Sequence, residues 1–215
     1  MVQPITKIEV ASRQVATAIE LVLSRSDIVS AHTLAFAARD ILANLCQHRR
    51  IRVTFDDIFL ACGPALERDL RFHLRKHYTF FKHADRDPDA TLDLHDDRYT
   101  DFVLIECLER LKALGAYPPQ CAFFPIWVQF CTPGMFMGGP ARVLFEPMQQ
   151  LIHLWRRDEQ CVLGLMFSRL MQDRKSEAMA LAASLDKTRR NDMRVLEAMF
   201  PAAMLMVQQM TQQAK

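Results

Sequence analysis

The sequence predicts an all-α protein, a helical bundle of about eight or nine helices. Glycine is scarce, with 6 among 215 residues, whereas Leu, Ala, Met, Arg and Gln, which favour helices, are abundant. Apolar residues recur at helical spacing along most of the chain. The run IRVTF, within residues 51–59, has β character but is too short and isolated to build a sheet, so that segment stays open.

Two helices open the chain as an antiparallel hairpin. The first ends near residues 24–27, after an apolar stripe at helical spacing made of Ile8, Ala11, Val15, Ile19 and Val22. Ser26 or Asp27 can cap the second helix, because a short polar side chain accepts hydrogen bonds from free backbone N–H groups. Small residues in the second helix allow close approach, and its apolar stripe runs through Leu34, Ala38, Ile41 and Leu45.

Two more helices complete the first half of the chain. Gly63-Pro64 breaks the chain, and a third helix is expected over about residues 65–81. A polar, aspartate-rich loop follows over residues 85–97. The fourth helix ends at Gly115, which suits the left-handed conformation of a helix C-cap, and its apolar stripe is Leu104, Leu108 and Leu111.

The run Tyr117-Pro118-Pro119 marks an internal boundary. We expect an N-terminal up-down bundle over residues 1–115 and a Met-rich helical layer over residues 116–215, packed together as one globular unit. After an apolar stretch with Pro125, further helices are expected over about residues 141–157, 159–172, 174–186 and 190–213. Ten of the 12 methionines lie at or beyond residue 137, and such flexible side chains suit adaptable binding surfaces.

Charge and cysteine usage limit the classes of partner and compartment. A formal net charge of +2 predicts no general affinity for nucleic acid or membrane, so any such contact needs a local patch. No run of 18 apolar residues is present and the N-terminus lacks the pattern of a secretory signal, which predicts a cytoplasmic protein without a membrane span. The six cysteines form no CxxC pair and are expected to be reduced, packed thiols.

The acidic loop resembles an EF-hand calcium loop over twelve residues. Asp85, Asp87, Asp89, Asp93 and Asp96 fall at positions 1, 3, 5, 9 and 12, where oxygen ligands can wrap a hard cation such as Ca, Mg or Mn. The loop departs from that pattern at position 6, which is alanine, and at position 12, which is not glutamate. His83 could extend the set to manganese or iron. The alternative is a solvated turn whose aspartates cap the next helix.

The third helix carries two further patterns. His73 and His77 form an i, i+4 pair that can chelate zinc or can be hydrogen-bonded within the bundle. A basic stripe, consisting of Arg68, Arg71, Arg75 and Lys82, lies away from the apolar stripe of the same helix. Its charge is either neutralised by the acidic loop, within the chain or across an oligomer, or available for phosphate or RNA.

Arg71 and His77 also fit a short Arg-x(4–6)-His motif, as do Arg68 and His73. With this motif and the helix order, residues 6–115 resemble HEPN-like helical bundles. The resemblance implies that Arg71 and His77 meet across a dimer interface and cleave RNA without a metal, the histidine as general acid or base and the arginine stabilising phosphate charge. The segments HTLAFAARDIL and FFKHADRDPD are also similar to a group of bacterial proteins, a likeness that implies helices and no chemistry.

The sequence as a whole favours a binding or regulatory module. GxGxxG, Walker A, GxSxG and HExxH motifs are absent, which weakens the common dehydrogenase, ATPase, hydrolase and zincin interpretations. We therefore expect an intracellular helical module that self-associates as a homodimer or binds a protein through a Met-rich apolar face. The alternatives are a HEPN-like or cation-assisted ribonuclease or phosphodiesterase, and a divalent-cation-binding protein.

Overall fold

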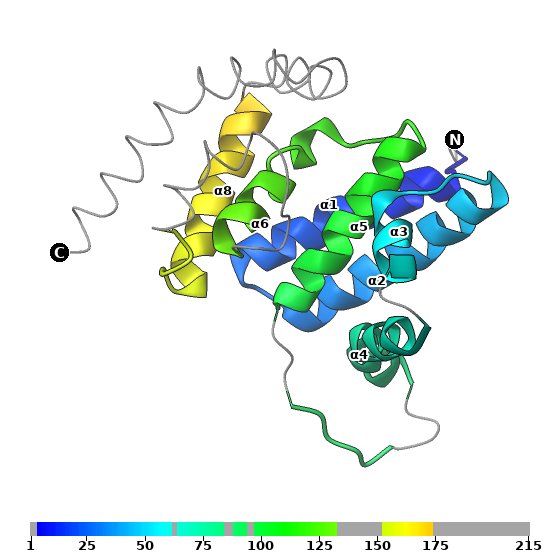
Figure 1. Ribbon diagram of the computed structural model, residues 1–215. Coiled ribbons are helices and arrows are strands. Elements are labelled where there is room, and N and C mark those ends of the chain that lie inside the picture. The colour runs from blue at the N-terminus through cyan, green and yellow to red at the C-terminus, as the bar shows by residue number, and fades with distance from the viewer. Residues whose placement is uncertain (1–3, 62–63, 84–87, 94–96, 133–151, 174–215) are drawn as a thin grey trace.

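The computed structural model describes residues 4–61, 64–83, 88–93, 97–132 and 152–173. This part of the chain is helical and contains no strand, which confirms the all-α prediction (Figure 1). It comprises seven α-helices and one 3-10 turn: α1 (Lys7–Ser24), α2 (Ile28–His48), α3 (Thr54–Ala61), α4 (Pro64–Lys82), α5 (Arg98–Ala113), η1 (Pro119–Cys121), α6 (Phe124–Cys131) and α8 (Arg157–Asp173). No helix among these residues is both long and apolar enough to cross a membrane.

Helices α1 and α2 form the predicted hairpin, and the start of each helix is specified by a local cap. A capping box starts α1, in which the Thr6 hydroxyl accepts from the Glu9 backbone N–H and the Glu9 carboxylate accepts from Thr6. Asp27, one of the two predicted caps, accepts from the backbone N–H of Val29 at 3.0 Å. The two helices are packed together, and both carry small, fully buried residues that allow close approach: Ala11, Ala18, Ala31, Ala35 and Ala38.

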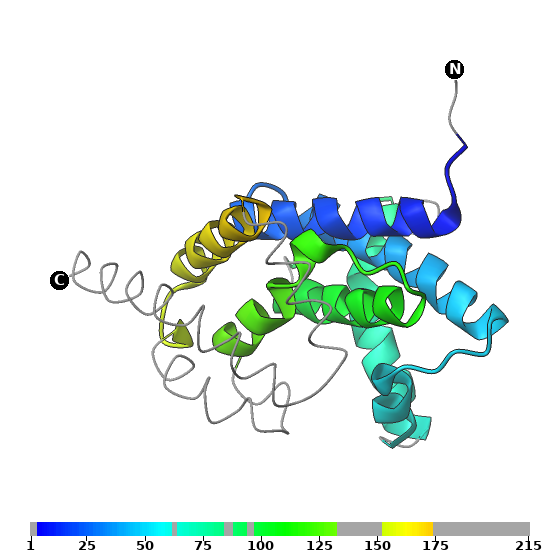
Figure 2. The same cartoon turned by 90° about the horizontal axis from the view of Figure 1, so that it is seen from above.

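Helix α5 lies in the middle of the body, packed against α1 and α2 (Figure 2). Its predicted stripe is buried, with Leu104, Leu108 and Leu111 each at most 1% exposed. Gly115 follows the helix with a φ of +72°, and the backbone N–H of Ala116 donates to the Leu111 carbonyl at 2.9 Å. This is a Schellman ending, and it confirms the expected role of Gly115.

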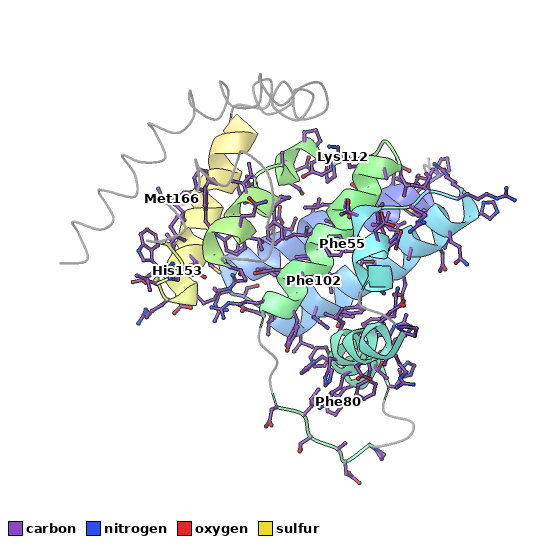
Figure 3. The ribbon with its side chains drawn as sticks, viewed as in Figure 1. Phe55, Phe80, Phe102, Lys112, His153 and Met166 are labelled. Atoms are coloured by element: carbon purple, nitrogen blue, oxygen red, sulfur yellow. The ribbon has the colours of Figure 1, made fainter. Side chains whose placement is uncertain are left out.

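Residues 51–59, whose secondary structure the sequence did not decide, are helical from Thr54 onward. The backbone N–H groups of Thr54 and Phe55 donate to the carboxylate of Glu109 on α5, at 3.0 and 3.2 Å. A carboxylate at this position satisfies the free donors of the first turn and complements the helix dipole. Phe55 also meets Phe102 of α5 edge to face at 5.0 Å, so α3 is fixed to the body at its start (Figure 3).

A second layer, built from η1, α6 and α8, packs on α1 and α5. Trp127 is 1% exposed and donates its indole N–H to the Gln160 carbonyl at 2.7 Å. Gly164 of α8 leaves room for this indole and for Leu23 of α1. The expected helix 159–172 is confirmed as α8, whereas residues 133–151 and 174–215 lie outside the described part, with most of the Met-rich face. The division at residue 115 stays a prediction.

Helix α4 is set apart from this body. Figure 1 shows it nearly end-on beneath α2, and Figure 2 shows it lengthwise. It packs mainly against α2 and α3. Most of its side chains are therefore exposed, and the predicted histidines and basic stripe belong to this helix.

Candidate functional site

The inner side of α4 is attached to α2 by an aromatic contact and an ion pair. Leu74 and Tyr78 are its buried residues with described side chains, and Tyr78 stacks on Phe36 at 5.1 Å. Arg75 donates to both carboxylate oxygens of Asp40, at 2.8 and 2.7 Å. The ion pair is half exposed, so the aromatic packing supplies most of the attachment.

His77 belongs to an aromatic cluster on one flank of α4. Its ring lies 6.2 Å from His32, and it stacks on Tyr99 at 6.4 Å. Burial lowers the pKa of His77, and the charge of Lys76 lowers it further, while a hydrogen bond to the Asp93 backbone opposes the shift. His77 is therefore neutral at pH 7, when it can accept or donate a proton but carries no charge.

His32 is the most enclosed member of this cluster, and the predicted site does not include it. It is fully buried, and its Nδ1 lies 3.0 Å from the Thr100 hydroxyl of α5. Its ring also contacts Phe36 and Phe81, at 4.8 and 5.9 Å. His32 lies at helical spacing from the buried Ala35 and Phe36 on the packed face of α2, and that pattern could have identified it as a buried histidine.

The structure does not bring Arg71 and His77 together within one chain. Six residues of α-helix separate them by about 9 Å along the axis and about 120° around it. Arg71 forms an ion pair with Glu67 one turn earlier, at 2.9 Å, and is exposed to solvent. A meeting of the two side chains across a dimer stays a prediction.

All four members of the basic stripe have partners within the chain, although the ion pair of Arg68 with Asp69 is long, at 3.8 Å. Arg71 pairs with Glu67 and Arg75 with Asp40. The Lys82 ammonium lies 5.5 Å from the centre of the Tyr78 ring. Internal partners thus account for much of the stripe's charge, while contact with RNA stays a prediction.

The outer surface of α4 carries an exposed aromatic residue that the sequence pattern did not identify as a site. Phe72 is 63% exposed, with Arg68 one turn before it and Lys76 one turn after it. His73 is exposed beside it, 5.7 Å from the Phe72 ring. Figure 3 shows the side chains of α4 around the labelled Phe80, below the body of the molecule.

The predicted metal site is only partly described. His83, Asp89 and Asp93 are exposed, while Asp85, Asp87 and Asp96 lie outside the described residues. Among the residues that the structure describes, no three His, Cys, Asp or Glu side chains are grouped closely enough to hold a metal ion. Among these described residues, His73 and His77 likewise have no third side chain of these types close enough to complete a zinc site. Binding of Ca, Mg or Mn at this loop stays a prediction.

A buried ionic network joins α2, α3 and α5. Glu106 is fully buried and accepts from Arg39 at 2.7 Å and from Arg110 at 2.8 Å. Arg110 also donates to Asp56 of α3 at 2.7 Å. Burial alone would lower the pKa of Arg110, but the Asp56 and Glu106 carboxylates outweigh it and raise that pKa. These charges hold helices together, and their donors face carboxylates rather than an open site.

A second ionic network joins α1, α5 and α8. Arg157 donates to Asp97 at 3.0 Å and to the buried Asp101 at 2.6 Å, and it lies 4.8 Å from the Trp127 ring centre. Arg25, which ends α1 in the left-handed conformation, pairs with Asp97 and Asp158. Like the first network, it fixes the layers to each other.

The cysteines are packed as expected. The five described ones, Cys46, Cys107, Cys121, Cys131 and Cys161, are free and buried, while Cys62 lies outside the described residues. Burial raises the pKa of Cys121 to about 12 and that of Cys161 to about 11. These thiols are protonated at pH 7 and are poor nucleophiles.

Comparison with known proteins adds no family. No family model, no curated protein and no solved structure matches the chain. The resemblance to HEPN-like bundles therefore stays a prediction, and function has to be argued from the geometry of α4.

Proposed function

We propose that the chain is a non-catalytic, cytoplasmic binding or regulatory module whose binding surface is the outer face of α4. The observation that carries the proposal is Phe72, a large apolar side chain 63% exposed on a helix that projects from the body. An exposed aromatic residue with cations one turn away on each side is typical of an interface anchor with a charged rim. Free, buried thiols support a reducing compartment.

The chemistry of the described residues supports binding over catalysis. The two buried ionic networks use their arginines and carboxylates to join helices, and the described thiols are protonated. His77 is neutral, but Arg71, its proposed catalytic partner, is engaged with Glu67 on a different flank of α4. Within one chain, Arg71 and His77 therefore do not converge on a common phosphate position.

Photo-crosslinking tests the proposal directly. A photoreactive aromatic amino acid would replace Phe72, and in a matched control it would replace Val29, which is 38% exposed at the start of α2. We expect adducts from position 72 in cells that express the chain, with the control position giving few. Equal yields at both positions would contradict a binding surface on α4.

The ribonuclease alternative is tested by cleavage of a single-stranded RNA by the full chain. We expect no cleavage that depends on Arg71 or His77. Activity lost in both Arg71→Ala and His77→Ala would replace the proposed function with the HEPN-like one.

The cation alternative is tested by thermal unfolding after chelation, with calcium, magnesium or manganese added back. Binding selective for the folded state must raise the midpoint. A rise lost in Asp85→Ala and Asp87→Ala would establish the metal site, and it would add a ligand to the module without making it catalytic.

A further inference from the structure

We propose that the outer face of α4 binds the acidic segment 88–93 of a second copy of the chain, in a reciprocal dimer. This inference rests on the proposed function and names the partner of its surface. Each copy supplies one α4 and one acidic segment, so a two-fold axis creates two identical contacts.

The receiving face consists of one aromatic and two basic side chains in line. Arg68, Phe72 and Lys76 are spaced by one helical turn, so the two cations are about 12 Å apart along the axis. The Arg68 side chain is 80% exposed, and its ion pair with the adjacent Asp69 is long, at 3.8 Å. Lys76 is exposed, and within the described part of the chain it makes no ion pair. The face therefore presents positive charge on both sides of an apolar centre.

The segment 88–93 has the complementary pattern. Asp89 and Asp93 are both exposed, and the exposed Thr91 lies midway between them. Four residues of extended chain span about 13 Å, close to the separation of the two cations on α4. Side chains alternate along an extended chain, so Asp89, Thr91 and Asp93 point to the same side. Each carboxylate can then meet one cation while the exposed Thr91, midway between them, covers part of the Phe72 ring with its methyl group.

The acidic segment of the same chain lies on a different side of α4. The backbone of Asp93 is hydrogen-bonded to His77. His77 and Phe72 are about 140° apart around the helix axis. The chain thus holds its own acidic segment on the side of α4 that carries His77. The side chains of Asp89 and Asp93 are exposed there and can contact another copy.

The charge on this face favours a short acidic segment over RNA. Arg71 and Arg75, which would extend the basic track, already pair with Glu67 and Asp40. Asp69 adds a negative charge beside Arg68 on the outer side. A polyanion needs several phosphate contacts in succession to bind tightly, whereas a segment with two carboxylates needs only the two cations present.

A charge exchange between the two surfaces tests the proposal. One variant combines Arg68→Asp with Lys76→Asp, and the other combines Asp89→Lys with Asp93→Lys. We would measure the dimer dissociation constant by sedimentation equilibrium at low salt. We expect the wild-type chain to dimerise and each variant alone to have a dissociation constant at least about tenfold higher. An equimolar mixture of the two variants should recover the dimer, because both contacts of the mixed pair again join opposite charges.

Controls separate this interface from general charge effects and from misfolding. Arg13→Asp with Arg52→Asp makes the same charge change at exposed positions outside α4 and should leave the dimer intact. Phe72→Ser should weaken the dimer without changing net charge. A monomeric wild-type chain, a dimer indifferent to both exchanges, or a mixture that fails to recover would each overturn the proposal.

The crosslinking experiment distinguishes failure of the reciprocal dimer from failure of the proposed function. Adducts from position 72 with the mass of a different protein would leave the binding module intact and refute the second copy as its partner. Adducts with RNA would refute the second copy and favour the RNA-binding stripe. Absence of selective adducts would refute the proposed function itself.

Discussion

Helices α4 and α5 are similar in length, with 19 and 16 residues, but they differ in how they are packed. Almost every residue of α5 from Thr100 to Leu111 is buried, including charged ones, whereas α4 buries Leu74 and Tyr78 among its described side chains. The ion pairs of α5 are enclosed and those of α4 face water. The difference teaches that α5 organises the fold, while α4 presents a surface.

Removing the buried charge on α5 should have the largest effect. Glu106→Gln leaves Arg39 and Arg110 buried without a common carboxylate, and we expect a loss of about 3 kcal/mol in the free energy of unfolding. Denaturant unfolding measures it. The matched control is Asp57→Asn, which breaks the exposed pair with Arg52 and should cost less than about 1 kcal/mol. Equal losses would mean that burial does not distinguish the two ion pairs.

Filling the space beside α8 should have the next largest effect. A Cβ at position 164 would lie 2.5 Å from Cδ2 of Leu23 and 2.9 Å from the Trp127 indole nitrogen. Gly164→Ala should therefore cost about 1–2 kcal/mol, since overpacking exceeds the gain in helix propensity. Ser168→Ala on the same helix should change the unfolding free energy by less than about 0.5 kcal/mol. A stabilised Gly164→Ala would refute the close packing of α1, α6 and α8.

The sequence predicted these body helices better than it predicted their polar contacts. Periodicity identified α1, α2 and α5, because each has one apolar stripe, and Asp27 and Gly115 marked ends through local chemistry. The helical start of α3 depends on Glu109, which lies about fifty residues away in the chain. Sequence periodicity compares only residues that are close together in the chain, so it cannot identify such a partner.

The site on α4 shows the same limit. Spacing identified Arg71 and His77 as a pair, but their surroundings depend on Glu67, Tyr99 and the Asp93 backbone. Phe72 lies on the side of α4 opposite the buried Leu74, so helical periodicity could have indicated its exposure but not the cations that flank it or their partners. The Met-rich face and three of the predicted metal ligands lie outside the described residues.

Lowering the pH should weaken the attachment of α4 before it affects α5. The folded state holds the pKa of His77 below the usual value of 6.5, so the unfolded chain binds that proton more readily. The contribution of neutral His77 to stability is complete above pH 6.5 and is lost as the pH falls below it. Thermal unfolding at pH 7.5 and 5.5 measures the loss, and His77→Gln should reduce the difference between the two midpoints. An unchanged difference in His77→Gln would show that another group titrates.

Breaking an exposed pair on α4 should have a small effect. Arg71→Ala removes the i, i+4 pair with Glu67 and should cost about 0.3–0.5 kcal/mol in denaturant unfolding. A loss of several kcal/mol would place Arg71 in a buried network like that of α5.

Removing the exposed aromatic residue should have the smallest effect on stability. Phe72→Ser should leave the unfolding free energy of the dilute monomer within about 0.5 kcal/mol, because the ring is mostly in water already. A substantial destabilisation would mean that Phe72 packs within its own chain and is no binding residue.

Hydrogen exchange at two protein concentrations tests the central claim most directly, that α4 presents a binding surface and α5 organises the fold. The amides of α4 should exchange faster than those of α5 in dilute protein, through local opening of a helix with few buried contacts. Raising the concentration from about 1 μM to about 200 μM should slow exchange in α4 and leave α5 unchanged, because association protects only the helix at the interface. Exchange of both helices at one common rate, with no dependence on concentration, would contradict the account.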